Sequence, residues 1–234
     1  LLLNKAWALS LCDLLWRFNR QRQTPCVFSC NYRIAATPPE EDVFQSMSRA
    51  NIKLLEIGVE SGSERLRKEI LQRNYSNENC LKTVELARKY GLDVNVYNMM
   101  GFPTETMADH WDTIRLNRAI CPKRSLTSIF YPYPGTKLYE RCLADGLIPP
   151  GEKLDPLERR RASLDLPTFP KKKIQRAYCL FEWRIYVNTK PFLFRFRRLI
   201  RNCITANQMT SRLFNMLLPY WHALRRRAGI EIQD

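Results

Sequence analysis

The sequence predicts an α/β fold in which strand–helix units repeat along a parallel sheet, followed by an α-helical tail. Over the first 145 residues, short β-rich runs alternate with helical patterns at a spacing of about 35 residues. This alternation ends after Gly146, and the patterns beyond residue 171 are helical only. An open doubly wound sheet and part of a βα barrel both agree with such a repeat.

Four runs have the composition of strands, at residues 25–33, 52–60, 93–102 and 126–133. Helical patterns cover residues 1–23, 39–50, 62–90 with a break near Asn74, 105–119 and 136–145. The segment Thr37–Glu41 looks like a helix start, with acidic residues in the first turn. Tyr90-Gly91 looks like a helix stop just before the third strand.

The chain divides into three predicted segments: part of a barrel at 1–146, an irregular linker rich in proline and charge at 147–171, and a basic helical tail at 172–234. In the tail, residues 172–188, 191–203 and 207–228 have helical patterns. The chain lacks tandem repeats, which excludes a solenoid, and has no run of 18 apolar residues, which excludes an ordinary membrane span. Because Leu1 begins directly in a helical pattern, we expect an internal fragment whose amino-terminal part is missing.

The formal charge of +15 is concentrated in the tail. Residues 1–150 have 20 basic and 16 acidic side chains, whereas residues 151–234 have 18 and 7. Within the tail, residues 192–201 mix aromatic side chains with arginines such as Arg197, Arg198 and Arg201. This helix could cover the barrel with its arginines solvated, lie on an anionic membrane, or bind nucleic-acid phosphates. Nucleic acid is the weakest of the three interpretations.

The eight cysteines permit a metal-site or a packing interpretation. Six are scattered singly, as in an intracellular protein that uses reduced cysteines as small apolar residues. Cys26 and Cys30 form a C-x3-C pair, but they would lie about 13 Å apart along a strand. We therefore expect no metal ligand in this chain and a cytoplasmic location.

In parallel strand–helix folds, functional groups lie at the carboxyl ends of the strands. This rule selects Arg33 and the segments 60–63, 99–103 and 131–136. Strand alternation puts Glu60 on the face away from the helices, where its carboxylate could accept hydrogen bonds from sugar hydroxyls or an ammonium group. The alternative is that residues 61–64 form only a turn and a helix cap.

The next two strand ends are open to two interpretations each. Met99 could lie against a flat apolar ring and Gly101 permits close backbone approach, or the methionine simply fills the core. The proline-rich segment 131–136 leaves amides and carbonyls for the edge of a ligand, or it is only a rigid turn.

Three segments together resemble the latter half of a radical S-adenosylmethionine (SAM) domain: GVESGSERL with Arg73 downstream, MMGFPTET, and YPYPGTKLYE. The resemblance extends over about residues 1–145 and more loosely to 177–201, and it is greatest to the group whose members often carry a cobalamin-binding domain. It implies a partial (βα)6 radical SAM barrel with its last four strands visible. In that family, SAM binds a 4Fe–4S cluster and is cleaved to methionine and a 5′-deoxyadenosyl radical.

The resemblance also implies roles for individual residues. Glu60 and Ser61 would meet the ribose or the methionyl group, and Arg73 would meet the methionyl carboxylate.

The two later strand ends would hold the base. Met99 and Gly101 would support adenine, and backbone near Tyr131 and Pro132 would read its edge. No residue is assigned a catalytic role.

Two departures from the family pattern stand out. Tyr97 replaces a usual glycine, and the acidic residue falls one position late, at Glu105. The cluster motif C-x3-C-x2-C belongs upstream of Leu1, and Cys26-x3-Cys30 imitates only its first half.

The leading hypothesis is thus a fragment of a radical SAM enzyme, with cobalamin-dependent methyl transfer as a candidate reaction and the cluster ligands outside this chain. One alternative is a tRNA methylthiotransferase, although such proteins usually end in a small β-barrel. The other is a non-catalytic interaction protein that kept the fold without the cluster. For the enzyme we expect a small-molecule or lipid-like substrate and peripheral membrane contact through the tail.

Overall fold

The computed structural model describes residues 4–149, 151, 159–207, 210 and 216. Within these residues, four parallel strands form one sheet in the order β1 (Phe28–Tyr32), β2 (Ile52–Glu60), β3 (Asp93–Met100) and β4 (Arg124–Ile129). Each strand pairs with the next one along the chain, so successive crossovers of the same hand place their helices on one face. A doubly wound sheet would need a reversal of strand order. The structure therefore confirms the partial barrel.

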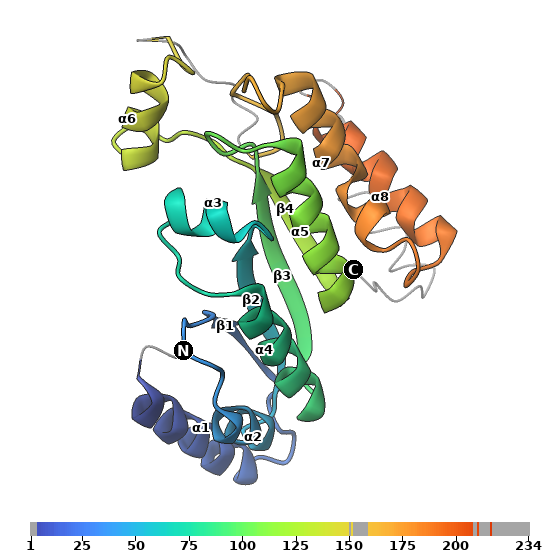
Figure 1. Ribbon diagram of the computed structural model, residues 1–234. Helices are drawn as coiled ribbons and strands as arrows, with labels where there is room; N and C mark the ends of the chain where they lie inside the picture. Colours follow the sequence, from blue (N-terminus) through green and yellow to red (C-terminus); the bar gives the residue numbers. More distant parts are fainter. Residues whose placement is uncertain (1–3, 150, 152–158, 208–209, 211–215, 217–234) are drawn as a thin grey trace.

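The helices follow the predicted sequence of elements. They are α1 (Lys5–Arg20), α2 (Glu41–Arg49), α3 (Glu64–Glu69), α4 (Asn77–Lys89), α5 (Met107–Ile120), α6 (Lys137–Ala144), α7 (Lys171–Ile185) and α8 (Phe192–Thr205). Figure 1 shows α3 and α6 beyond the carboxyl ends of the strands. The helical pattern at 62–90 is two helices, α3 and α4, as the break near Asn74 predicted. The helix predicted at 207–228 falls largely outside the described residues.

The predicted boundary signals act locally as expected. Glu41 and Asp42 occupy the first turn of α2, where carboxylates favour the positive end of the helix dipole. Gly91 follows the end of α4 with a φ of +71°, a conformation that glycine adopts without steric cost.

Alternating side chains of β2 face the core, as predicted. Leu55, Ile57 and Val59 are at most 1% exposed and pack with α2 and α4. The intervening Glu56 and Glu60 are half-buried on the opposite face. This alternation leaves the second face of the sheet free for polar groups.

A second apolar core lies between the ends of β3 and β4 and helix α7. Phe102 and Ile129 from the barrel segment share it with Phe169 and Phe181. The boundaries at residues 146 and 171 stay predictions, but α7 itself packs directly on the strand-helix body. No described helix has the length and apolarity that a membrane span requires.

Candidate functional site

A cleft of about 520 Å³ opens at the carboxyl ends of β2, β3 and β4. The strand ends contribute Glu60, Met99 and Tyr131, and the connection between α3 and α4 contributes Arg73. These four side chains are partly buried, whereas the cleft residues from α6 and the nearby Arg159 are largely exposed and so form its outer part. The cleft lies where the strand-end rule placed the functional groups.

An unusual turn directs Glu60 into this cleft. The residue has a φ of +60°, and the Ser61 N–H donates to the Val59 carbonyl at 2.7 Å across it. A non-glycine residue in this region is strained, and such strain is commonly found at functional sites. Tyr75 holds the turn, because its hydroxyl donates to the Val59 carbonyl at 2.9 Å.

Glu60 and Arg73 form the charged centre of the cleft. The Arg73 Nη2 lies 3.3 Å from the Glu60 Oε1, and the two side chains are 32% and 19% exposed. Burial raises the pKa of Glu60, and the positive charge of Arg73 opposes that rise. A side chain at Gly58 would reach within 2.8 Å of the Glu60 Oε1, so glycine leaves space for the carboxylate. The pair offers one acceptor group and one donor group to a ligand.

An apolar and aromatic wall lies beside this pair. Met99 and Phe130 line it, with the ring of Phe102 centred 5.4 Å from that of Phe130. Tyr131 and Tyr133 continue the wall, their ring centroids 4.8 Å apart. A flat heteroaromatic ring matches such a surface.

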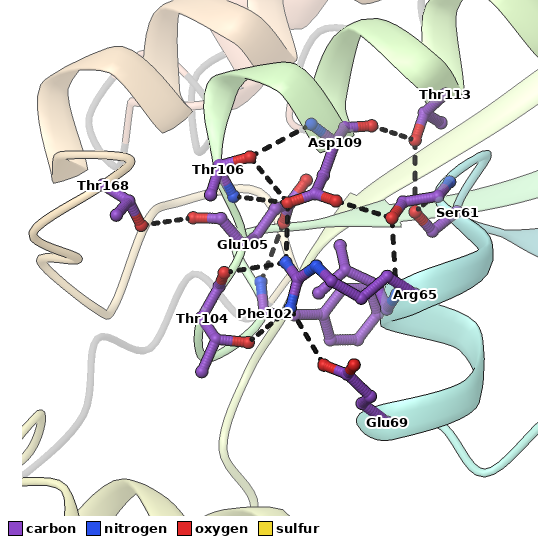
Figure 2. A network of polar contacts seen from close by, with 12 residues as sticks. Ser61, Arg65, Glu69, Phe102, Thr104, Glu105, Thr106, Asp109, Thr113 and Thr168 are labelled. Atoms are coloured by element: carbon purple, nitrogen blue, oxygen red, sulfur yellow. Dashed lines mark hydrogen bonds and ion pairs between the residues drawn. The ribbon is translucent and has the colours of Figure 1, made fainter.

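A buried polar network fixes the loops after β2 and β3 (Figure 2). Asp109 accepts hydrogen bonds from Ser63, from the Thr106 hydroxyl at 2.7 Å and from the Arg65 guanidinium at 2.7 Å. These donors hold the pKa of Asp109 below its ordinary value, although burial acts to raise it. The network ties the cap of α3 to the cap of α5, so the two loops behind the cleft are held together.

Glu105 anchors the loop after β3 from within. Its carboxylate accepts the amide hydrogens of Gly101 and Phe102, and its carbonyl accepts the Thr168 hydroxyl at 2.7 Å. The side chain is almost fully enclosed, and burial raises its pKa to about 8, opposed by the two amides. Sequence reasoning noted Glu105 only as a displaced acidic residue.

The structure brings Glu60, Arg73, Met99 and Tyr131 to one cleft and leaves the other candidates outside its lining. The Ser61 hydroxyl is buried against Thr113 of α5, at 3.2 Å. The Gly101 amide is taken by the Glu105 carboxylate, and Pro132 is buried.

Arg33, beyond β1, is exposed and does not line the cleft. Since side-chain direction at a bulged or turned strand end does not follow strict alternation, sequence spacing could not separate these residues. Their roles in binding stay predictions.

Sequence reasoning missed the outer part of the cleft. Lys137 and Arg141 of α6 and Arg159 of the linker all line it. The first two lie four residues apart on a helix that begins inside the YPYPGTKLYE motif, and this spacing was a readable signal. The placement of Arg159 depends on a long-range backbone contact that no local pattern encodes.

The described residues do not fit a 4Fe–4S cluster. They contain no group of three or more His, Cys, Asp or Glu side chains placed to hold a metal. Cys30 lies within β1 and Cys26 just before it, both partly buried, and all eight cysteines are free. By contrast, the cleft offers a paired acceptor and donor beside a flat apolar wall, which fits a nucleoside carrying an amino-acid chain.

Parts of the chain are similar to known sequences. The family model described as the radical SAM superfamily matches residues 9–116. An uncharacterized methyltransferase of Pyrococcus horikoshii is 29% identical over 108 residues, covering 46% of this chain and 23% of that protein. A tRNA-2-methylthio-N(6)-dimethylallyladenosine synthase of Paracoccus denitrificans is 32% identical over 96 residues, covering 40% of this chain and 21% of the synthase. The matched region spans less than a quarter of either relative.

Two solved structures share the fold. Coproporphyrinogen III oxidase of Escherichia coli, a radical SAM enzyme, aligns with a TM-score of 0.56 and 21% identity over 78% of this chain and 38% of that one. The radical SAM methyltransferase TsrM of Kitasatospora setae, solved with cobalamin and its 4Fe–4S cluster, aligns with a TM-score of 0.50 and 19% identity over 65% and 31%. At this identity the similarity shows the fold alone.

Proposed function

We propose that the chain belongs to the radical SAM superfamily, whose family model matches residues 9–116, and that its cleft binds S-adenosylmethionine as part of a radical SAM enzyme. The observation that carries this proposal is the shared cleft of Glu60, Arg73, Met99 and Tyr131 at the carboxyl ends of the strands. When bound, S-adenosylmethionine supplies a sulfonium whose carbon–sulfur bond breaks on reduction, giving methionine and a 5′-deoxyadenosyl radical.

Each part of the ligand has a counterpart in the cleft. Arg73 donates hydrogen bonds to the methionyl carboxylate, and the Glu60 carboxylate accepts them from the ammonium group or the ribose hydroxyls. The Met99 side chain and the ring of Tyr131 flank the adenine. The turn at Glu60, held by Tyr75, keeps the carboxylate in place before the ligand arrives.

A binding measurement tests this proposal without any redox step. We expect S-adenosylhomocysteine to bind the 234-residue chain in isothermal titration calorimetry, and Arg73→Gln to weaken binding by about tenfold or more, because a charge-assisted hydrogen bond is lost. Arg115→Gln removes a comparable charge from an exposed ion pair on α5 and is the matched control. Equal affinity of both variants and the parent chain would contradict the assignment.

We propose further that the cluster is held by residues outside this chain, since the part of the chain that the structure describes does not fit one. After anaerobic reconstitution with iron and sulfide, the 234-residue chain alone is then expected to form no 5′-deoxyadenosine. Formation of 5′-deoxyadenosine by the purified chain would overturn this part of the proposal and leave the binding assignment intact.

For the reaction of the whole protein we propose methyl transfer assisted by cobalamin. One curated relative is named a methyltransferase, and TsrM, which shares the fold, was solved with cobalamin. The second candidate is tRNA methylthiolation, favoured by the 32% identity to the Paracoccus enzyme. Among the described residues, helices α7 and α8 follow the sheet and no strand does, which disfavours the small β-barrel expected of that class.

An assay on the whole protein separates these reactions and the non-catalytic alternative. Incubation with SAM labelled in its methyl group is expected to give a methylated product in the presence of cobalamin. A methylthio-modified tRNA would favour the second candidate instead. A chain that binds no S-adenosylhomocysteine would favour the non-catalytic interaction protein.

We also propose that α8 contacts an anionic lipid surface. Its outward face carries exposed apolar side chains: Phe192, Leu193, Phe196 and Ile200. The arginines named from the sequence divide between two sides of the helix, because Arg198 and Arg201 approach the buried Glu182 of α7 while Arg197 is exposed. An apolar ridge beside cationic side chains fits the boundary between lipid headgroups and acyl chains.

Vesicles of phosphatidylserine and phosphatidylcholine test this contact. Phe192→Ser with Phe196→Ser is expected to reduce co-sedimentation severalfold, and salt is expected to weaken it. Trp7→Ser with Leu14→Ser removes equally exposed apolar side chains from α1 and serves as the control. Unchanged binding by the α8 variant would remove the proposal.

A further inference from the structure

The cleft carries more positive charge than its own carboxylates balance, and the excess lies in its outer part. Its two lining carboxylates, Glu60 and Glu69, already lie 3.3 Å from Arg73 and 3.1 Å from Arg65. Three further cations line the cleft: Lys137, Arg141 and Arg159. Of these, only Arg141 has an ion-pair partner among the described residues, Asp145 at 3.4 Å.

The backbone of the linker fixes the position of Arg159. Its carbonyl accepts the N–H of Ile129, the last residue of β4, at 2.7 Å, and its φ is +65°. The following Arg160 carbonyl accepts the Gln175 side-chain amide of α7 at 3.1 Å. A non-glycine residue in the left-handed region persists only where its surroundings hold it, so the backbone of Arg159 is held at the edge of the cleft.

Helix α6 presents a second cationic edge. Lys137 and Arg141 lie four residues apart, so both side chains project from one face of the helix toward the cleft. Two like charges at this spacing repel each other, and an anion between them and Arg159 relieves that repulsion.

An aromatic surface stands between these cations and the inner cleft. The guanidinium carbon of Arg159 lies 6.0 Å from the centre of the Tyr133 ring, which in turn packs against Tyr131. Leu138 adds an apolar side chain to the same lining. A ligand there meets rings on one side and positive charge on the other.

Building on the proposed function, we propose that this outer subsite, formed by Tyr133, Lys137 and Arg159, binds the second substrate through a phosphate or carboxylate attached to an aromatic or apolar body. Charge-assisted hydrogen bonds from Lys137 and Arg159 hold the anion, and the body lies along Tyr133 toward the inner cleft. The substrate is thereby oriented with its anionic end away from the Glu60–Arg73 pair.

Phenyl phosphate and benzoate are simple probes of this subsite. Their binding to the 234-residue chain is measured by isothermal titration calorimetry without and with saturating S-adenosylhomocysteine, and phenol and inorganic phosphate are titrated for comparison. We expect at least one of the two aromatic anions to bind, and to bind more tightly than either comparison compound; the preferred anion separates phosphate from carboxylate. Lys137→Gln with Arg159→Gln should raise its dissociation constant about tenfold or more, because two charged donors are lost.

The control variant is Lys172→Gln with Lys173→Gln, which removes the same charge from exposed positions outside the cleft lining. An equal loss of affinity in this control would show a general charge effect and overturn the subsite. Phenol or inorganic phosphate binding as tightly as the aromatic anions would overturn the required pairing of anion and body. Displacement of the aromatic anion by S-adenosylhomocysteine would show one site instead of two.

The outcomes separate this inference from the proposed function. If S-adenosylhomocysteine binds through Arg73 but the anions ignore Lys137 and Arg159, only the outer subsite is wrong. If the anions depend on Lys137 and Arg159 while S-adenosylhomocysteine does not bind, the proposed function fails and the anion subsite stands.

Discussion

Replacing Glu105 by glutamine tests whether the loop behind the cleft is built around a protonated carboxyl group. The carboxyl is 1% exposed, and burial raises its pKa from 4.5 to about 8, although hydrogen bonds from the Gly101 and Phe102 amides oppose this rise. Because the folded pKa exceeds the unfolded one, the folded protein keeps a proton that the unfolded chain loses between about pH 4.5 and 8. The free energy of unfolding therefore falls as the pH rises through this window.

The slope for one such group is about 1.4 kcal/mol per pH unit, or about 3 kcal/mol between pH 5 and 7.5. Glu105→Gln keeps an oxygen acceptor for the two amides but cannot ionise. We expect urea unfolding to show that, as the pH rises from about 5 to 7.5, the free energy of unfolding of the variant increases by about 3 kcal/mol relative to that of the parent chain.

Measuring each variant against the parent chain isolates the contribution of Glu105. His110 is buried and its pKa is lowered to about 4, so its contribution to stability rises with pH between 4 and 6.5, the opposite sign. That contribution is the same in both proteins and cancels in their difference. Glu69→Gln makes the same substitution at a solvent-exposed carboxylate and is the matched control variant. A constant difference between Glu105→Gln and the parent chain would refute the reasoning.

Further substitutions test other parts of the fold. Gly101→Ala should destabilise the chain by about 1–3 kcal/mol in thermal or urea unfolding, since its φ is +82° and a Cβ would lie 3.3 Å from Ile174. Gly91→Ala should cost less stability, because Gly91 has a similar φ of +71° but open space around the added Cβ. Equal losses of stability in the two variants would contradict the role of packing at Gly101. Arg67→Met should cost about 3 kcal/mol or more, because the buried guanidinium donates to two backbone carbonyls and to the side chain of Asn77 in α4. Lys68→Met, at the exposed neighbouring position, should change stability by less than about 0.5 kcal/mol, and a similar loss in both would refute the role of Arg67.

The positions of the strands along the chain and their buried faces could be predicted because both depend on local chemistry. The alternation of Leu55, Ile57 and Val59 with polar neighbours sets the buried face of β2, and capping residues set the helix ends. The choice between a barrel and a doubly wound sheet was open because it depends on the pairing of distant strands. The sequential order β1-β2-β3-β4 decides it.

The candidate site was predictable at the strand ends and less so between them. Glu60, Met99 and Tyr131 occupy the ends of strands, so the strand-end rule found them. Ser61 turns toward α5 because the backbone reverses at Glu60. No local sequence signal predicts this turn. Arg159 reaches the cleft through a backbone hydrogen bond to β4 from a linker expected to be irregular.

The most direct test of the account is whether S-adenosylhomocysteine reaches the side chain of Met99. With carbon-13 in the methionine methyl groups and Met99→Leu used for assignment, a titration of the chain should shift the Met99 methyl resonance saturably, since adenine would lie beside it. The methyl resonance of Met47, a fully buried residue of α2 in the other core, should stay unmoved. A Met99 resonance that stays fixed, or moves only together with that of Met47, would contradict a nucleoside site in this cleft.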